Sequence, residues 1–324
     1  MISASEYNNL GVAYNREGDP QQAIAQFWEA IRLDSNHFEA HSNLGAALHN
    51  QGLLDEALIE CREAVRLNPN DADARFNLGN VLSDKGLMEE ASAEYKAAIC
   101  ISPDDADAHY NLGVVLENVH YAGSLDEAIL QFRKSLEIAP NSPDAHTNLG
   151  NCLRRKALYA DAVLEFEQAI SLDPNSFEAQ FNLARAFDEA YQIDKAISAY
   201  ERAVALDASD NDLADAHFFL GNALQKRERL DEAIEEYQKA LRLTPRSYEA
   251  HIHLGSALHE YGLLDDATAA YQRGLELIPI TKPYQQERTV TTRLLADAFA
   301  DKGCLDKAAN LRSVAETLEQ SAEL

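Results

Sequence analysis

The strongest constraint on this chain is a short motif, Asn-Leu-Gly, that returns at a fixed spacing. Its first four copies are 34 residues apart and a fifth follows after 37. The copies begin at Asn9, Asn43, Asn77, Asn111 and Asn148. A period of 34 residues is typical of a helical repeat array, in which each unit buries its core only by stacking on the next. Such an array offers a long binding surface in place of one deep pocket.

The alignment extends beyond the motif to eight repeats. They fall at residues 4–37, 38–71, 72–105, 106–142, 143–176, 177–210, 214–247 and 248–281. Position 7 is always Leu, position 8 is small, position 20 is always Ala, position 24 is mostly aromatic and position 32 is usually Pro. Small residues let two helices approach closely, large ones fill the grooves between helix pairs, and Pro ends the second helix. Each repeat is therefore predicted to be a helix–turn–helix hairpin.

This pattern resembles the tetratricopeptide repeat (TPR) family over nearly the whole chain. The resemblance implies an all-α fold: a right-handed α-solenoid superhelix of stacked helix-turn-helix repeats, forming a single domain over residues 1–324. One departure is position 4, where the family places an aromatic residue and this chain mostly has histidine. These histidines are His41, His109, His146, His217 and His251.

The end of the chain departs from the repeat. Residues 282–288, which include Pro283, read as an insertion, and residues 289–324 read as a degenerate ninth repeat and C-terminal cap. Arg312 stands at the aromatic position of that repeat. A terminal helix must turn a polar face to water, so a polar last helix is expected.

Composition narrows the class of partner. The chain has 54 acidic and 28 basic residues, a net charge of −26, which disfavours nucleic acid and anionic membranes. No apolar run is long enough for membrane insertion, and no signal peptide is visible at the N-terminus. Four scattered cysteines fit a reducing compartment. We expect a cytoplasmic protein.

Motifs of catalysis are not found. The sequence has no G-x-S-x-G, P-loop, G-x-G-x-x-G or H-E-x-x-H pattern. The repeated histidines should lie about one interhelical distance apart, too far to share a metal. We therefore expect no catalytic residue, no cofactor and no metal site, and a structural use for the histidines.

In the TPR family, the first helix of each repeat lines a concave groove through positions 2, 5, 6, 9, 12 and 13. Carried over here, position 6 gives a ladder of asparagines that could hydrogen-bond an extended peptide backbone. Its members are Asn9, Asn43, Asn77, Asn111, Asn148 and Asn182. The ladder resembles the repeat arm of O-linked N-acetylglucosamine transferases. The alternative is an ordinary structural asparagine, which is frequent at this position in the family.

A basic set occupies other groove positions of repeats five to seven. It consists of Arg154, Arg155, Arg185 and Lys226. Basic residues on the inner face of an acidic protein suggest a ligand with an acidic segment or a terminal carboxylate. The alternative is a set of local ion pairs with Asp188 and Glu189. Position 2 is acidic in repeats two to eight, so the two-carboxylate clamp of chaperone-binding family members is not expected.

The only tryptophan, Trp28, falls at position 25 of the first repeat, where later repeats have polar residues. This position predicts a protein interface at Trp28, and with it a homo-oligomer that forms through the N-terminal repeat. The alternative is that Trp28 folds over its own repeat near Ile24 and Ile31.

Together these features predict a non-enzymatic scaffold that binds an extended peptide or partner subunit during complex assembly. Two alternatives remain open. One is the recognition arm of a peptide glycosyltransferase whose catalytic domain is on another chain. The other is a self-associating structural protein.

Overall fold

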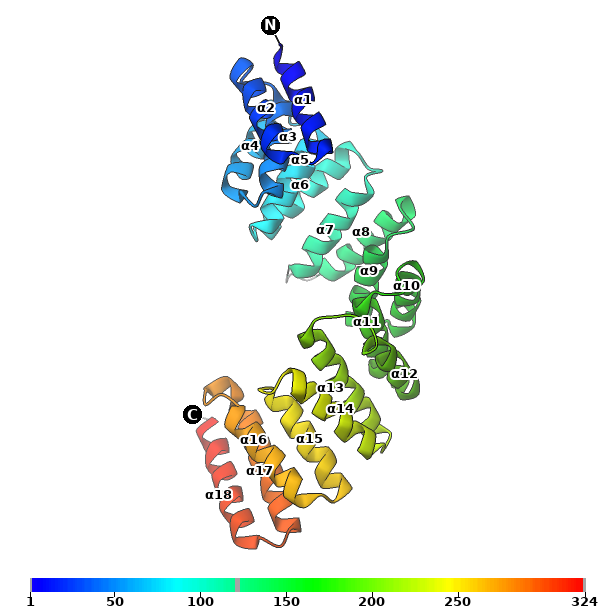
Figure 1. Cartoon of the computed structure of the whole chain (residues 1–324), viewed down its shortest axis with the longest axis vertical. Coiled ribbons are helices and arrows are strands. Elements are labelled where there is room, and N and C mark those ends of the chain that lie inside the picture. The colour runs from blue at the N-terminus through cyan, green and yellow to red at the C-terminus, as the bar shows by residue number, and fades with distance from the viewer. Residues whose placement is uncertain (1, 120–122, 323–324) are drawn as a thin grey trace. The chain divides into compact units, whose positions relative to one another are not determined.

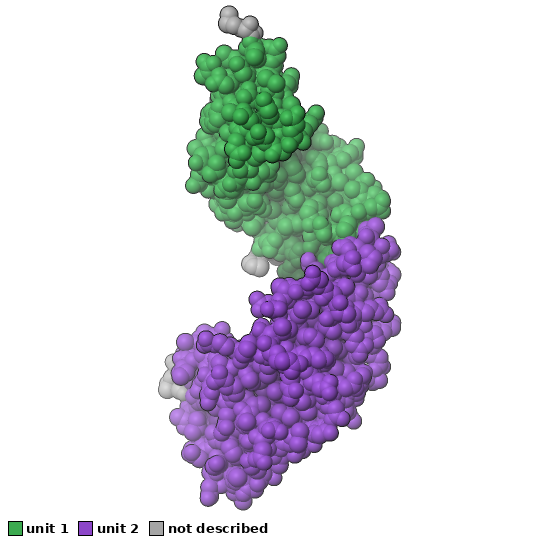
Figure 2. All heavy atoms as spheres, viewed as in Figure 1, with its two compact units in different colours: residues 1–158 green, residues 159–324 purple. Residues whose placement is uncertain are grey.

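The computed structural model describes residues 2–119 and 123–322. Within these residues the secondary structure is helical throughout, with no strand (Figure 1). The chain divides into two compact units, residues 1–158 and 159–324 (Figure 2). The predicted all-α class is confirmed. The single solenoid over residues 1–324 and the hand of its superhelix stay predictions.

Among its described residues, unit 1 consists of four helix pairs that follow the first four repeats, and of the first helix of repeat five. Its helices are α1 (Ala4–Glu17), α2 (Pro20–Leu33), α3 (Phe38–Asn50), α4 (Leu54–Leu67), α5 (Ala72–Asp84), α6 (Met88–Ile101), α7 (Ala106–Asn118), α8 (Ser124–Ile138) and α9 (Pro143–Arg155). The two helices of a pair pack together, and each second helix also packs against the first helix of the next pair. This is the stacking of consecutive helix pairs that the period predicts.

Unit 2 continues the same scheme. Its helices are α10 (Tyr159–Leu172), α11 (Phe177–Glu189), α12 (Ile193–Ala203), α13 (Asp210–Lys226), α14 (Leu230–Leu243), α15 (Tyr248–Tyr261), α16 (Leu264–Leu277), the short 3₁₀ helix η1 (Lys282–Tyr284), α17 (Gln285–Asp301) and α18 (Leu305–Ala322). The residue before a first helix commonly caps it. The Ser176 and Ser247 hydroxyls, for example, accept the backbone N–H groups of Ala179 and Ala250.

The core repeats one contact between position 8 and position 24. A Cβ added to Gly79 would lie 2.6 Å from the ring of Tyr95, and one added to Gly221 would lie 2.7 Å from the ring of Tyr237. No real side chain tolerates such distances, so glycine lets the aromatic ring lie against the first helix. In repeat two Cys61 replaces the ring, and its sulfur occupies the space beside Gly45. Burial raises the pKa of the Cys61 thiol to about 12.

The turn inside each repeat requires a left-handed residue. Gly52 adopts φ +74° there, which costs glycine little. Repeats five to seven lack this glycine, yet Ala157, Tyr191 and Glu228 adopt φ of 58° to 59°. Non-glycine residues are strained in this region. Backbone hydrogen bonds, such as that from Gln192 N to Phe187 O at 2.8 Å, hold the turn closed.

Two insertions extend helices. Residues 211–213, inserted before repeat seven, form part of the first turn of α13, which begins at Asp210. The second insertion was predicted at residues 282–288, but its last four residues belong to α17, which begins at Gln285. The fourth repeat contains residues 120–122, which lie outside the described part of the chain.

Helix α18 buries few of its apolar side chains, and its role as a C-terminal cap stays a prediction. In α18 the described buried apolar residues are Ala308 and Ala315. Arg312, at the former aromatic position, forms an ion pair with Asp297 at 3.0 Å instead of filling the core.

Candidate ligand-binding face of the first helices

The asparagines at position 6 connect neighbouring first helices. Asn43 donates a side-chain hydrogen bond to Oδ1 of Asn8 at 2.9 Å, and Asn77 donates to the hydroxyl of Ser42 at 3.1 Å. In both cases the acceptor is position 5 of the preceding repeat. These bonds link α3 to α1 and α5 to α3.

The next two asparagines also bond to the preceding first helix, Asn111 to a residue at position 9 and Asn148 to one at position 5. Asn111 donates to Oδ1 of Asn80 at 3.0 Å, and Asn148 donates to the Tyr110 hydroxyl at 3.0 Å. At the ends of the ladder, Asn9 is exposed and Asn182 is buried. Four of the six predicted peptide-binding amides therefore already bridge repeats, which is the structural use that the sequence left open.

The surface formed by the first helices of consecutive repeats is called the first-helix face. In unit 1 a hollow lies on this face, between α3, α5 and α7. Its volume is about 320 Å³. It is lined by His49, Asn80, Ser83, Asp84, Tyr95, Tyr110, Asn111 and Val114. Amide groups and aromatic rings thus share one concavity with a ladder asparagine.

A second hollow lies on the first-helix face of unit 2, between α11, α13 and α15. Its volume is about 540 Å³. It is lined by Asp188, Phe219, Asn222, Gln225, Lys226, His253, Ser256 and Glu260. In repeats seven and eight the ladder position holds Phe219 and His253, so aromatic rings succeed the asparagines. Phe218 lies between them, with ring centroids 5.4 Å from Phe219 and 5.0 Å from His253.

The predicted basic set is divided between the two units. Arg155 of unit 1 forms an ion pair with Glu117 at 3.1 Å, and Arg154 is half-buried. In unit 2, Nζ of Lys226 lies 2.7 and 2.8 Å from the two carboxylate oxygens of Asp188. Arg155 and Lys226 therefore have acidic partners.

Arg185 of unit 2 is also engaged. Its guanidinium lies 3.4 Å from Glu189 and 5.4 Å from the ring centroid of Phe219. Asp188 and Glu189 are the two acidic partners that the alternative interpretation named. The geometry supports local ion pairs as the main role of Arg185 and Lys226.

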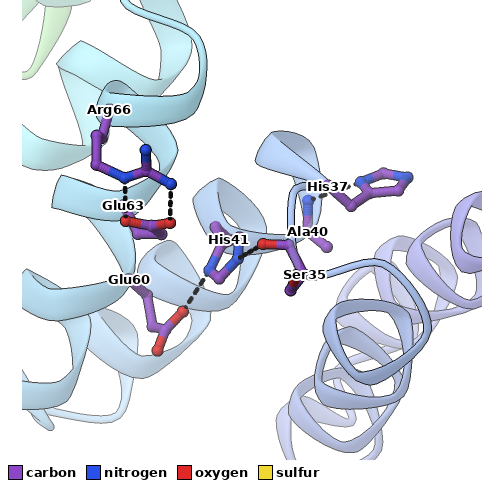
Figure 3. Close-up of polar contacts among 7 residues, drawn as sticks. All are labelled: Ser35, His37, Ala40, His41, Glu60, Glu63 and Arg66. Atoms are coloured by element: carbon purple, nitrogen blue, oxygen red, sulfur yellow. Dashed lines mark hydrogen bonds and ion pairs between the residues drawn. The ribbon is translucent and has the colours of Figure 1, made fainter.

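The histidines at position 4 make polar contacts, some with the second helix of their own repeat and some with backbone carbonyls of the preceding repeat. Nδ1 of His41 lies 2.6 Å from a carboxylate oxygen of Glu60, and Nε2 lies 3.2 Å from the carbonyl of Ser35 (Figure 3). Both partners only accept hydrogen bonds, so His41 satisfies both as an imidazolium. The Glu60 hydrogen bond accordingly raises the pKa of His41.

The side-chain contact between position 4 and position 23, called the clasp, recurs in other repeats. Nδ1 of His109 lies 2.6 Å from Gln131, and Nδ1 of His217 lies 2.6 Å from Glu236. Burial alone would raise the pKa of Glu236, but the hydrogen bonds from His217 and Lys239 together lower it. Each clasp ties the start of a first helix to the second helix of its own repeat.

Core tyrosines also reach the first-helix face. The hydroxyl of Tyr95 donates to Oδ1 of Asn80 at 2.7 Å, and that of Tyr237 donates to Oδ1 of Asn222 at 2.8 Å. This pairing of positions 24 and 9 was not anticipated. The sequence carries only part of a signal for it, because Phe27 and Phe132 accompany the apolar residues Val12 and Val114 at position 9, but Phe166 accompanies Asn151.

Trp28 lies on α2 and is 46% exposed, beside the fully buried Phe27. Leu10, at position 7 of the first repeat, is 41% exposed, whereas Leu44 and Leu78 at the same position are buried. The first helix pair therefore presents apolar surface. Its use as an interface stays a prediction.

The described part of the chain offers neither a metal site nor a membrane-spanning helix. No group of three or more His, Cys, Asp or Glu side chains there could hold a metal ion. No helix in residues 2–119 or 123–322 is long and apolar enough to cross a membrane. The four cysteines are free thiols.

Comparison with known families assigns the fold. Profiles described as "TPR repeat" and "Tetratricopeptide repeat" match residues 80–119, 120–156, 221–262, 8–72, 147–211 and 60–91. Together they cover residues 8–211 and 221–262. The chain belongs to the tetratricopeptide repeat family. A protein-interaction scaffold is the general role that this family indicates. No curated protein matches the sequence significantly.

Solved structures support the same fold. YrrB, described as a TPR protein with an unusual peptide-binding site, is 23% identical over 55% of this chain and 91% of its own, with a TM-score of 0.51. The pilF protein of Pseudomonas aeruginosa is 21% identical over 61% and 89%, with a TM-score of 0.54. A TPR protein of Parabacteroides merdae is 18% identical over 80% and 100%, also with a TM-score of 0.54. At these identities the likeness concerns the fold.

Proposed function

We propose that this chain is a non-catalytic scaffold that holds an extended segment of a partner protein against its first helices. One observation carries the proposal: in each unit a hollow on the first-helix face combines side-chain amides with aromatic rings. Amides such as Asn222 and Gln225 can donate to and accept from a peptide backbone. Rings such as Phe219 offer apolar area for side chains.

The ladder asparagines have a double role in this proposal. Each bridging amide uses one N–H to hold the next repeat, so it sets the spacing of the face that a ligand meets. Asn111 both bridges to Asn80 and lines the unit 1 hollow. Contact with a peptide then uses the second N–H of the amide. A glycosyltransferase arm gains no support from this arrangement, because the bridging needs no glycosylation substrate.

The ion pairs change the expected charge of the ligand. Lys226 and Arg185 are already neutralised by Asp188 and Glu189. An acidic segment would have to displace these carboxylates. We therefore propose that the paired cations shape the unit 2 hollow, and that an acidic ligand is not required. Participation in complex assembly follows only from the scaffold role and is part of the same proposal.

Selection of peptides from a random displayed library against the purified chain tests this function. We expect selected peptides to bind the wild-type chain. Ser83→Arg and Ser256→Arg place a bulky side chain in the two hollows and should weaken that binding at least tenfold. Ala25→Arg and Gln238→Arg make the same change at exposed positions of the second helices α2 and α14 and should not. Equal loss in both pairs, or no selected peptide at all, would argue against the first-helix face.

A further inference from the structure

A third hollow lies between the first turns of α15 and α17 and has a volume of about 460 Å³. Its wall from α15 includes Tyr248, Glu249 and Ile252, and its wall from α17 includes Glu287 and Val290. The hollow therefore combines an aromatic ring, two apolar side chains and two carboxylates.

The insertion after repeat eight builds half of this hollow. In the repeat pattern the ninth first helix would begin at residue 289, and its second position would be Val290. Instead α17 begins at Gln285, and the extra turn carries Glu287. The edge of η1 supports the aromatic wall, since the ring of Tyr284 lies edge-on to that of Tyr248, with centroids 6.2 Å apart. The regular repeat alone would supply only Glu249.

The carboxylates of Glu249 and Glu287 give this hollow a negative electrostatic potential. Burial first, then a hydrogen bond to Glu249 and the nearby charges of Glu249 and Glu287, raise the pKa of Tyr248 to about 12. Burial, together with the charge of Asp212, raises the pKa of Asp215 on α13. The charge of Arg185 opposes this shift, and the charge of Glu249 adds to it. Carboxylates thus accumulate at this end of the first-helix face.

Neighbouring side chains leave this charge unneutralised within the hollow. Arg288 is directed elsewhere, donating to the carbonyls of Leu275 and Ile278 at 3.2 and 3.0 Å. His253, which also lines the hollow, has a pKa lowered by burial and is neutral near pH 7. No lysine or arginine is among the lining residues of the described chain.

We infer that this hollow binds a lysine or arginine side chain of the segment held on the first-helix face. The cation is matched by Glu249 and Glu287 and by the face of the Tyr248 ring, and the aliphatic stem is matched by Ile252 and Val290. The inference rests on the proposed scaffold function and adds the chemical class of one ligand group. Calcium takes six to eight oxygen ligands, and no group of three or more His, Cys, Asp or Glu side chains that could hold a metal ion lies among the described residues, so the hollow is assigned to an organic cation.

Fluorescence anisotropy with two labelled probes tests the inference. The probes are peptides of sequence Gly-Ser-Gly-Lys-Gly-Ser-Gly and the same peptide with norleucine in place of lysine. We expect the lysine probe to bind the wild-type chain at least tenfold more tightly. Glu249→Gln with Glu287→Gln should remove that preference, and Tyr248→Leu should reduce it about two- to fivefold, the size of an exposed cation–π contact.

A matched control separates a local site from the overall field of an acidic protein. Glu235→Gln with Glu316→Gln removes the same charge from exposed positions on α14 and α18. This control should retain the lysine preference. Equal losses in the two double variants, or equal binding of the two probes to the wild type, would overturn the inference. All four glutamates are exposed, and circular dichroism verifies that each variant folds.

The outcome is distinct from that of the scaffold proposal. Library peptides that need the first-helix face but are indifferent to Glu249→Gln with Glu287→Gln would retain the function and overturn the cation site. A lysine preference lost only in that variant would support the site even if the library yields no peptide.

Discussion

The hydroxyl of Tyr237, at the centre of the packing between α13 and α14, lies 2.8 Å from Oδ1 of Asn222 on the first-helix face. Tyr95 and Asn80 stand in the same relationship at 2.7 Å. A fully buried core residue therefore helps to fix the orientation of an amide proposed to meet the ligand. The proposed function therefore predicts that stability and ligand binding are coupled at this pair.

Removing the Tyr237 hydroxyl should destabilise the chain by a small but measurable amount. We expect Tyr237→Phe to lower the free energy of unfolding by about 0.5–1.5 kcal/mol, the net worth of one hydrogen bond. The reverse change, Phe132→Tyr, should cost about 1–3 kcal/mol, because Val114 at position 9 offers no partner for the buried hydroxyl. Adding Val114→Asn should recover part of that loss. Urea unfolding followed by circular dichroism measures all three, and no recovery in the double variant would contradict the pairing.

The bridging role of the ladder can be separated from ligand contact. Asn77→Ala removes a hydrogen bond to Ser42 and should destabilise the chain by about 0.5–1.5 kcal/mol. Asn9→Ala, at the exposed start of the ladder, should stay within about 0.5 kcal/mol of wild type. Hydrogen exchange in α3 and α5 gives the comparison. Similar protection in both variants would show that the amide bridges do not hold the repeats.

The turn of repeat six should be improvable. Tyr191 is 90% exposed and adopts φ +59°, so its ring contributes little packing while its Cβ is strained. We expect Tyr191→Gly to raise the free energy of unfolding by about 0.5–1 kcal/mol, after the extra entropy of glycine in the unfolded chain is subtracted. Tyr191→Ala, which keeps the Cβ, should give no such gain. Thermal unfolding of the three proteins decides between strain relief and loss of an exposed ring.

His41 in unit 1 and His253 in unit 2 should contribute to stability with opposite dependence on pH. The pKa of His41 is raised in the folded state by its hydrogen bond to Glu60, so its stabilising contribution is complete below about pH 6.5 and is lost as the pH rises through the folded value. The pKa of His253 is lowered by burial, so its contribution is complete above about pH 6.5 and is lost as the pH falls toward the folded value.

Two variants isolate these contributions. His41→Gln, which copies Gln180 at the same repeat position, should cost more stability at pH 5.5 than at pH 8. His253→Phe, which copies Phe219, should resist acid better than wild type. Hydrogen exchange of α3–α4 and of α15, measured at both pH values, reports each site separately. The same pH response in wild type and variants would rule out these residues as its source.

Self-association through the first repeat makes a spectroscopic prediction. Trp28 is 46% exposed, so its fluorescence in dilute solution should be red-shifted and open to acrylamide. If the apolar surface with Leu10 joins two copies, the emission should become protected as concentration rises, with a doubled mass by light scattering. Trp28→Glu should abolish both changes. Emission and mass that do not vary with concentration would leave the surface without this role.

Much of the fold was predictable because a 34-residue period repeats the same local choices eight times. The close approach of Gly79 to Tyr95, for example, follows from a small residue and a ring recurring in phase. The predicted start of the ninth repeat at residue 289 does not coincide with the start of its first helix, since α17 begins at Gln285. The residues after Pro283 contain no helix breaker, so the helix includes the last four residues of the insertion. Periodicity describes repeats and cannot place an interruption.

The candidate site was predictable only as a set of positions. The asparagine ladder could be placed on the first helices, and its contact with a peptide stays a prediction. Its hydrogen-bond partners depend on how first helices register against each other in space. The bond from Asn148 to Tyr110 spans 38 residues and has no local signature. The clasp of His41 with Glu60 could have been found, since four of the five histidines at position 4 occur with Glu or Gln at position 23, His251 being the exception.

Cys61 replaces an aromatic ring in the core of repeat two. Its thiol can therefore report local opening of that repeat without an added label site. Its sulfur fills the space beside Gly45, and with its pKa near 12 almost no thiolate forms at neutral pH. Alkylating reagents act on the thiolate, so they should modify Cys61 only when repeat two separates. Cys100, exposed at the end of α6, should react at once. The ratio of the two labelling rates would then measure breathing of a single repeat in the unaltered protein.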